Sequence, residues 1–166
     1  MPKQDQGVSK DRYLVIPRVL IFITQPDKIL LIKGHPDKRL WANRYNGIGG
    51  HVEYGEDILT AAKRELLEET GLSDIDLVLC GNIMVDASDD IGICIFLFRG
   101  EYQAGDLIES KEGQCEWISF SCLDTLPLVE DLYQIIPKVM EFRMGDHPLI
   151  GHTYYDSDDQ MVIDIG

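Results

Sequence analysis

The sequence predicts a fold of mixed helices and strands, α/β in the broad sense and α+β in the strict one. One mixed β-sheet lies between helices. Its 166 residues suffice for one domain with its own hydrophobic core. Segments with strand and helix patterns follow in the order strands, helix, strands, helix, strands, and no segment repeats at a fixed period. We therefore expect a polar N-terminal tail over residues 1–11 and a single folded domain over residues 12–166.

The domain begins with the pattern of a β-hairpin followed by a loop. Residues 13–24 are largely apolar and β-branched, and Pro26-Asp27 is a typical turn into a second apolar run over residues 28–33. Residues 34–55 are rich in glycine and polar side chains. They predict a long loop with at most short extended pieces, and long loops in compact domains are often functional.

The clearest predicted helix follows this loop. Asp57 is a favourable N-cap, the helix extends to about Thr70, and Gly71 can adopt the left-handed conformation that closes helices. The remaining patterns predict three strands, a second helix that contains Pro137, and a closing hairpin. Their ranges are 77–85, 91–102, 115–120, 128–143, 153–155 and 161–165.

The charge of the chain excludes some classes of partner. Fifteen Lys and Arg against 29 Asp and Glu give a net charge of −14, which argues against long nucleic acids and anionic membranes. Residues 1–44 hold nine basic and four acidic side chains, or +5, and residues 45–166 hold six and 25, or −19. The longest apolar run, residues 93–98, is too short to cross a bilayer. Four cysteines without zinc-ligand spacing are typical of reduced thiols, so we expect a cytoplasmic protein.

Three glutamates gather on one side of the first predicted helix. At about 100° per residue, Glu65, Glu68 and Glu69 fall within roughly 100° of one another. Like charges three and four residues apart destabilise a helix, and carboxylates in its last turn also oppose the helix dipole. The pattern has two interpretations: a solvated acidic face, or a set of hard oxygen ligands for a cation such as Mg²⁺ or Mn²⁺.

The wider spacing favours the cation. Gly50 is followed after five residues by Glu56, and after seven more by Arg64-Glu65-Leu66-Leu67-Glu68-Glu69-Thr70-Gly71-Leu72. Here the sequence resembles the Nudix hydrolases, and all nine specified positions of the family signature match. The resemblance implies the Nudix fold, an α/β/α sandwich with a central mixed sheet and a catalytic loop-helix-loop. It also implies hydrolysis of a nucleoside diphosphate linked to a further group.

The resemblance implies roles for individual side chains of the signature. Glu65, Glu68 and Glu69 would be ligands of a divalent metal, Mg²⁺ with Mn²⁺ as a substitute, and the carbonyl of Gly49 a further ligand. Arg64 would orient a carboxylate.

Two further acidic positions have alternative interpretations. Glu56 either joins the metal site or braces the loop against the helix. Glu112 lies in a later loop that resembles the segment from which MutT-type members recruit another metal carboxylate, with Glu116 as the alternative. Either Glu65 or Glu112 would take the proton of the attacking water.

The resemblance extends, with lower specificity, to the MutT-like oxidised purine nucleoside triphosphatases. Residues 41–50 resemble their base-contacting loop, and Asn46, at the matching position, either contacts the base or braces a turn. Glu130 and Asp131 match the segment that reads the purine edge, or are simply acids favoured at a helix N-terminus. Lys33 is the expected substrate contact in a basic segment that also contains Lys38, Arg39 and Arg44.

The resemblance implies a Mg²⁺-dependent hydrolase that converts a nucleoside triphosphate to a nucleoside monophosphate and pyrophosphate. Oxidised purine nucleotides such as 8-oxo-dGTP are the candidate substrates. Two alternatives stay open: a Nudix hydrolase of ADP-ribose, a nucleotide sugar or a dinucleoside polyphosphate, and a non-catalytic nucleotide sensor. The expected partner is a small nucleotide, without long nucleic acid or membrane, and the apolar strands leave room for a homodimer.

Overall fold

The structure, a computed structural model, describes residues 2–7, 9, 11–102, 107–108, 110 and 112–166. The strands are β1 (Leu14–Gln25), β2 (Lys28–Gly34), β3 (Tyr45–Asn46), β4 (Val78–Val85), β5 (Ile91–Glu101), β6 (Gly113–Ser119), β7 (Leu149–Tyr155) and β8 (Met161–Ile165). The α-helices are α1 (Ile58–Thr70) and α2 (Leu132–Glu141), and short 3₁₀ helices cover Lys3–Gln6 and Phe120–Thr125.

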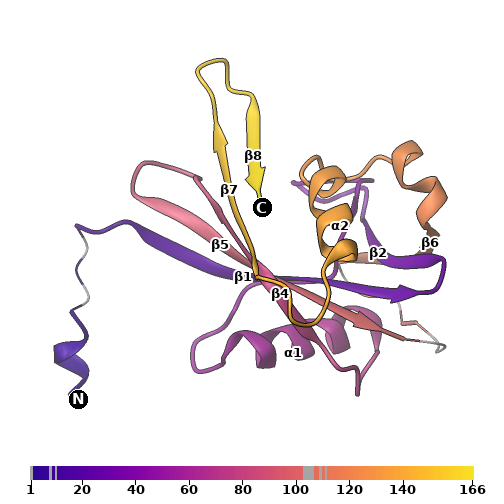
Figure 1. Cartoon of the computed structure of the whole chain (residues 1–166), viewed down its shortest axis with the longest axis horizontal. Coiled ribbons are helices and arrows are strands. Elements are labelled where there is room, and N and C mark those ends of the chain that lie inside the picture. The colour runs from indigo at the N-terminus through magenta and orange to yellow at the C-terminus, as the bar shows by residue number, and fades with distance from the viewer. Residues whose placement is uncertain (1, 8, 10, 103–106, 109, 111) are drawn as a thin grey trace.

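The eight strands form one mixed sheet in the order β3-β2-β1-β5-β4-β7-β8, and β6 pairs with β2. The β1–β5 and β4–β7 pairs are parallel, whereas the other pairs are antiparallel. The long β1–β5 ladder joins residues far apart in the sequence and forms the centre of the sheet. Figure 1 shows α1 and α2 on opposite sides of these central strands.

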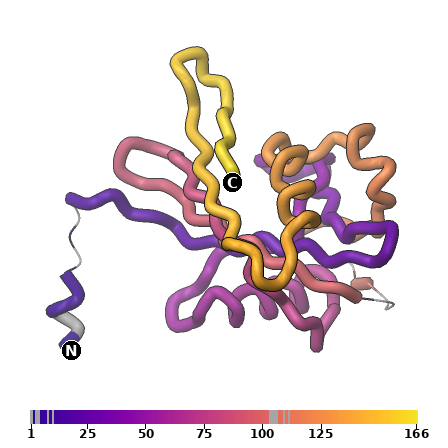
Figure 2. Tube along the Cα trace, viewed as in Figure 1, coloured from indigo at the N-terminus to yellow at the C-terminus, as the bar shows by residue number. Residues whose placement is uncertain are grey.

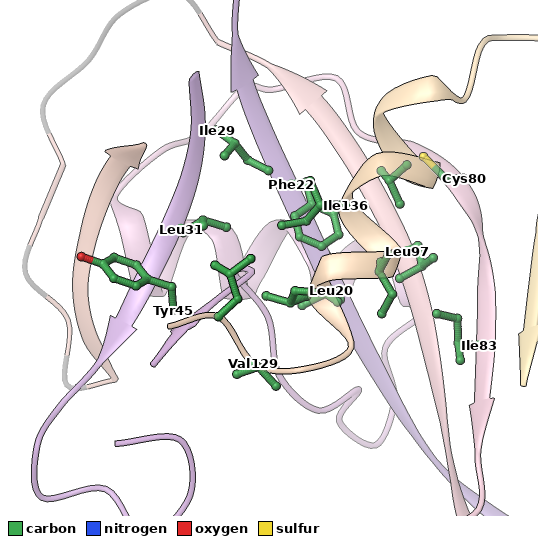
Figure 3. Close-up of a cluster of buried hydrophobic side chains, with 14 of the residues drawn as sticks. Leu20, Phe22, Ile29, Leu31, Tyr45, Cys80, Ile83, Leu97, Val129 and Ile136 are labelled. Atoms are coloured by element: carbon green, nitrogen blue, oxygen red, sulfur yellow. The ribbon is translucent and has the colours of Figure 1, made fainter. Parts of the chain in front are cut away.

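Each helix covers its own hydrophobic core. Because side chains alternate along a strand, β1 sends Ile21 toward α1 and Phe22 toward α2. On the α1 side the core includes Ala62 and Leu66 of the helix. On the α2 side, Phe22 and Ile136 of α2 belong to one buried cluster (Figure 3). The predicted sandwich of a mixed sheet between helices is therefore confirmed.

The last hairpin and the outer ends of the central strands project from the body of the fold (Figure 2). β7 and β8 pair antiparallel, and β7 also continues the sheet beside β4. The chain ends after β8, close to α2 (Figure 1). In the part of the chain that the structure describes, no helix is long and apolar enough to cross a membrane.

The second helix is shorter than predicted. Residues 128–143 were expected to be helical, but α2 covers Leu132–Glu141. The preceding segment is extended, because Leu128 forms a bridge with Tyr45 and the N–H of Val129 donates to the Tyr45 carbonyl at 2.9 Å. Glu130 therefore precedes the helix, and Asp131 occupies its N-cap position, where its carbonyl accepts from the N–H of Ile135 at 3.0 Å. Pro137 is tolerated inside α2, as expected.

The other predicted elements are present with small changes at their ends. The glycine-rich loop contains only the two-residue strand β3, and α1 ends at Thr70 with Gly71 in the left-handed conformation at φ 76°. The predicted tail, residues 1–11, contains one 3₁₀ turn, and its residues 1, 8 and 10 lie outside the described residues. Three of the four cysteines are buried and Cys122 is exposed; all four are free thiols.

Candidate active site

A glycine segment is held against the central strand and forms one wall of the site. The N–H of Val19 donates to the Gly50 carbonyl at 2.9 Å, and the N–H of Ile21 donates to the Ile48 carbonyl at 2.7 Å. Gly49 has a φ of 151°, and a Cβ atom there would lie 2.1 Å from the carbonyl oxygen of Val19. Only glycine allows this approach, which places residues 49 and 50 between β1 and α1.

The first helix is fixed at both ends. The Asp57 carboxylate accepts from the N–H groups of Leu59 at 2.8 Å and Thr60 at 3.0 Å, as the sequence predicted for an N-cap. The Gly71 N–H donates to the Leu67 carbonyl at 2.9 Å. With both ends closed, the buried face of α1 carries Glu69 into the interior, where only 5% of the residue is exposed.

Glu69 is a buried carboxyl group in an acidic neighbourhood. Its Oε2 accepts from the Gly49 N–H at 2.9 Å. Burial raises the pKa of Glu69 to about 7; the negative charges of Glu65 and Glu112 add to this rise, and the Gly49 N–H and the Lys38 ammonium oppose it. Near neutral pH, Glu69 is therefore poised between its protonated and ionised forms.

Arg64 connects the loop to the helix. It donates to both oxygens of Glu56, at 3.2 Å from Nε and 2.8 Å from Nη2, and to the His51 carbonyl at 2.9 Å. The Glu65 Oε1 accepts from Nη1 at 2.8 Å. Hydrogen bonds from Arg64 and then from the Glu53 N–H lower the pKa of Glu56, and these acceptors raise the pKa of Arg64 above its usual value. The geometry supports the brace interpretation of Glu56.

Glu65 lies directly beside the glycine segment. A Cβ atom at position 50 would come within 2.4 Å of its Oε1. The signature glycine is therefore the residue that leaves space for this carboxylate. Arg64 holds the same oxygen from the other direction, so the orientation of Glu65 is set by two neighbours before any ligand binds.

The remaining predicted metal carboxylates are exposed. Glu68 has 61% of its side chain exposed and lies 3.5 Å from Arg64 Nη1. Glu112 has 54% of its side chain exposed and forms an ion pair with Lys38, a contact that the sequence analysis did not identify. Lys111, which precedes Glu112 in the predicted segment, lies outside the described residues.

The donor chemistry of these residues fits a hard divalent cation. All four predicted side-chain ligands are carboxylates, and Gly50 keeps space open beside one of them. Among the described residues, no three acidic, histidine or cysteine side chains converge closely enough to hold a metal ion. Three of these carboxylates have a partner within the protein, since Glu65 bonds Arg64, Glu69 bonds Gly49 and Glu112 bonds Lys38.

The short strand β3 joins the predicted base-contacting segments. The Tyr45 N–H donates to the Pro127 carbonyl at 2.9 Å, and Val129 donates back to Tyr45. Asn46 is the next residue after Tyr45, which makes these contacts with the segment 127–131. The Asn46 Oδ1 accepts from the Gly47 N–H at 2.8 Å, so it also braces a turn. Lys33 Nζ lies 5.5 Å from the centre of the Tyr45 ring.

The two acids of the predicted purine-reading segment differ sharply. Glu130 is exposed. Asp131 is partly buried, and its Oδ1 is fully buried without a hydrogen-bond partner among the described residues. Burial raises the pKa of Asp131, and the charge of Glu130 adds to the rise. Hydrogen bonds from the backbone N–H groups of Asp131 and Leu132 oppose the rise. The unpartnered Oδ1 is available for a hydrogen bond with a ligand.

Glu116, the alternative to Glu112, points away from the carboxylates of α1. Side chains alternate along β6: Cys115 packs in the core beneath α1, where its thiol donates to the Glu69 carbonyl at 3.4 Å, and Glu116 points to the α2 side. There the Tyr45 hydroxyl donates to Glu116 Oε2 at 3.0 Å. The structure therefore favours Glu112 over Glu116 as the additional carboxylate.

Three comparisons with known proteins agree with this geometry. The family model described as NUDIX domain matches residues 15–139. The zebrafish (Danio rerio) protein named oxidized purine nucleoside triphosphate hydrolase is 35% identical over 109 residues, which cover 65% of this chain and 67% of the relative. The ADP-ribose pyrophosphatase of Methanocaldococcus jannaschii is 33% identical over 151 residues, covering 84% and 83%. The crystal structure of a MutT protein from Bacillus halodurans superposes with a TM-score of 0.75 at 23% identity, covering 91% of this chain and 97% of that one.

Proposed function

This chain belongs to the NUDIX domain family of hydrolases, and from this membership we propose a Mg²⁺-dependent cleavage of nucleoside triphosphates to a nucleoside monophosphate and pyrophosphate, with Mn²⁺ as a substitute. The observation that carries the proposal is the buried carboxyl group of Glu69 beside the oriented carboxylate of Glu65. We call α1 with Gly49 and Gly50 the phosphate end of the site, and β3 with residues 127–131 the base end.

The phosphate end would hold the metal. Its ligands would be the carboxylates of Glu65, Glu68, Glu69 and Glu112, with the carbonyl of Gly49. A divalent ion bound there would neutralise phosphate charge and lower the pKa of a bound water.

The side chains of the phosphate end would orient the metal ligands and remove a proton from the attacking water. Arg64 keeps Glu65 in place and is itself fixed by Glu56 through two hydrogen bonds. Glu65 and Glu112 are the two candidates for the base that removes the proton of the attacking water. Glu65 is already oriented, whereas Glu112 must first leave Lys38, so the geometry favours Glu65.

The base end would select an oxidised purine. The similarity to the zebrafish enzyme supports this substrate class. Asp131 supports it independently, since a carboxyl group with a raised pKa can donate or accept a hydrogen bond at a purine edge. Asn46 and Lys33 complete the proposed substrate contacts. The net charge of −14 supports a free nucleotide over a long nucleic acid, and the free thiols support a cytoplasmic enzyme.

ADP-ribose is the second candidate substrate. The relative from Methanocaldococcus jannaschii favours it, because the similarity extends over more of this chain than that to the zebrafish protein. Its products would be AMP and ribose phosphate, which chromatography separates from a monophosphate with pyrophosphate.

A substrate panel tests the proposal. The purified protein is incubated with dGTP, 8-oxo-dGTP, ATP and ADP-ribose, with Mg²⁺, with Mn²⁺ or with a chelator, and products are separated by ion-exchange chromatography. We expect metal-dependent release of pyrophosphate, fastest from the oxidised nucleotide. Exclusive cleavage of ADP-ribose would replace the first candidate by the second. Nucleotide binding without hydrolysis of any substrate would favour the sensor.

A further inference from the structure

Two loops leave the sheet side by side at the phosphate end. The ladder between β2 and β6 ends at the pair Gly34 and Gly113. One loop follows Gly34, and hydrogen bonds close its base: the Gly34 N–H donates to the Arg44 carbonyl at 2.9 Å and the Asn43 N–H to the Gly34 carbonyl at 3.0 Å. The other loop ends at Gly113. Residues far apart in the sequence therefore meet at this edge.

Lys38 of the first loop and Glu112 of the second form an ion pair. The same two charges act on the buried Glu69, whose pKa Glu112 raises and Lys38 lowers. Lys38 thus places a positive charge beside the carboxylates that would bind a metal. Arg64, the other cation of this region, instead bonds Glu56 and Glu65.

We propose that Lys38 competes with the divalent ion for Glu112. The ammonium group pairs with this carboxylate, and a divalent ion that binds Glu112 would displace it. The released ammonium group then binds phosphate oxygens of the nucleotide. This inference rests on the proposed function, because it takes Glu112 as a metal ligand.

The two ion pairs of the phosphate end differ in how easily they are displaced. The Arg64–Glu56 pair uses two hydrogen bonds, and its side chains are 29% and 12% exposed. The Lys38–Glu112 pair has one contact, and its side chains are 35% and 54% exposed. Exposed single-contact pairs are weak, whereas a divalent ion attracts a carboxylate with twice the charge. Lys38 is therefore the partner that a metal can replace.

The exchange links metal and nucleotide binding. Lysine has a flexible stem and three donors, so its ammonium group can turn from a carboxylate to a phosphate. A metal that frees Lys38 increases the affinity for the nucleotide, and by reciprocity the nucleotide increases the affinity for the metal. Removal of the Lys38 charge must then change both affinities, in opposite directions.

Mn²⁺ binding in the absence of nucleotide tests the competition. Free Mn²⁺ is measured by electron paramagnetic resonance during titration of the wild-type protein, Lys38→Gln, Lys38→Arg and Arg39→Gln. Arg39→Gln is the matched control, because it removes one charge from an exposed neighbour in the same loop. We expect Lys38→Gln to bind Mn²⁺ about two- to fivefold more tightly, the effect of one exposed ion pair, and the other variants to match wild type.

Steady-state kinetics at saturating Mn²⁺ test whether the released Lys38 binds the nucleotide phosphates. We expect Lys38→Gln to raise the KM for the nucleotide with kcat unchanged. Lys38→Arg should have the KM of the wild type. Unchanged or weaker Mn²⁺ binding by Lys38→Gln overturns the inference, and an unchanged KM overturns the transfer to phosphate. A wild-type protein that binds no Mn²⁺ overturns the proposed metal site and the inference with it. The expected Mn²⁺ shift without hydrolysis of any substrate supports the competition and overturns only the enzymatic proposal.

Discussion

The two ends of the site are built differently. At the phosphate end, Glu65 and Glu69 are already held, by Arg64 and by the Gly49 N–H. At the base end, the buried Oδ1 of Asp131 has no hydrogen-bond partner among the described residues. A satisfied network has partners within the protein, whereas a buried oxygen without such a partner is free to accept a hydrogen bond from a ligand. In the proposed function, the phosphate end therefore carries the chemistry and the base end selects the substrate.

Loss of the buried carboxylate at the phosphate end should have the largest effect. Glu69→Gln keeps the size of the side chain and removes its charge, so we expect kcat to fall by about 10²–10³-fold, the range for an essential charged group. Steady-state hydrolysis at saturating Mg²⁺ measures this loss. The control is Glu141→Gln, an exposed position on α2, which should keep wild-type turnover.

Wild-type turnover in Glu69→Gln would remove this residue from the proposed metal ligands. The same experiment on Glu65→Gln distinguishes a defect confined to Glu69 from one shared by the whole phosphate end.

The unfolding free energy should depend on pH because of Glu69. The pKa of Glu69 rises from 4.5 to about 7 on folding, so the native state keeps a proton that the unfolded chain has lost. The contribution of Glu69 to the unfolding free energy is fully present below about pH 4.5 and is lost as the pH rises toward 7. The loss is on the order of 3 kcal/mol.

Chemical denaturation of the wild-type protein and Glu69→Gln at a series of pH values checks this. The difference in unfolding free energy between the two proteins should change between pH 4.5 and 7 and be constant above it. A difference that does not vary with pH would show that Glu69 titrates normally. Saturating Mg²⁺ should reduce the wild-type loss at pH 7, because a cation stabilises the ionised carboxylate.

Weakening the hydrogen bonds of Arg64 to Glu56 and Glu65 should lower kcat less than the loss of the Glu69 charge. Arg64→Lys keeps the positive charge but cannot reproduce the two bonds to Glu56 together with those to Glu65 and His51. Groups that orient metal ligands typically contribute 10- to 100-fold, so we expect a fall of about that size in kcat. The neighbouring exposed Lys63→Arg is the control. Equal activity of Arg64→Lys and wild type would reduce the brace to an incidental ion pair.

The sequence predicted the helix of the phosphate end, because the features that define this helix are local. Glu65 and Glu69 lie on one helix at a fixed periodicity, and Asp57 and Gly71 mark the ends of that helix. Glycine is required at position 50 because a larger residue would collide with Glu65. The two residues are only 15 positions apart, so this constraint is also local in the sequence.

The base end and the Lys38–Glu112 pair were harder to predict, because they depend on long-range packing. Lys38 was recognised only as part of a basic segment, and its partner is 74 positions away. The start of α2 was misplaced because the bridge between Leu128 and Tyr45 keeps the chain extended, and local sequence pattern does not reveal that bridge. The direction of Glu116 also depends on long-range packing, because strand alternation does not show which face of β6 lies beneath α1.

The base end should control selectivity with the smallest effect on chemistry. In Asp131→Asn the carboxyl group becomes an amide of the same shape, which changes the donors and acceptors offered to a base. We expect the ratio of kcat/KM for 8-oxo-dGTP to that for dGTP to change by about tenfold, the size of one buried hydrogen bond to a ligand, with kcat for dGTP nearly unchanged. Competition assays with both nucleotides measure the ratio.

Glu130→Gln makes the same chemical change at the exposed neighbour and should leave the ratio as in wild type. Asp131→Ala separates selectivity from folding. Removal of an unsatisfied buried carboxyl group should preserve or raise the Tm while the selectivity is lost. A lower Tm with unchanged selectivity would mean that Asp131 stabilises the start of α2 and does not meet the base. The contrast between the two ends would then disappear, since both would be held by interactions within the protein.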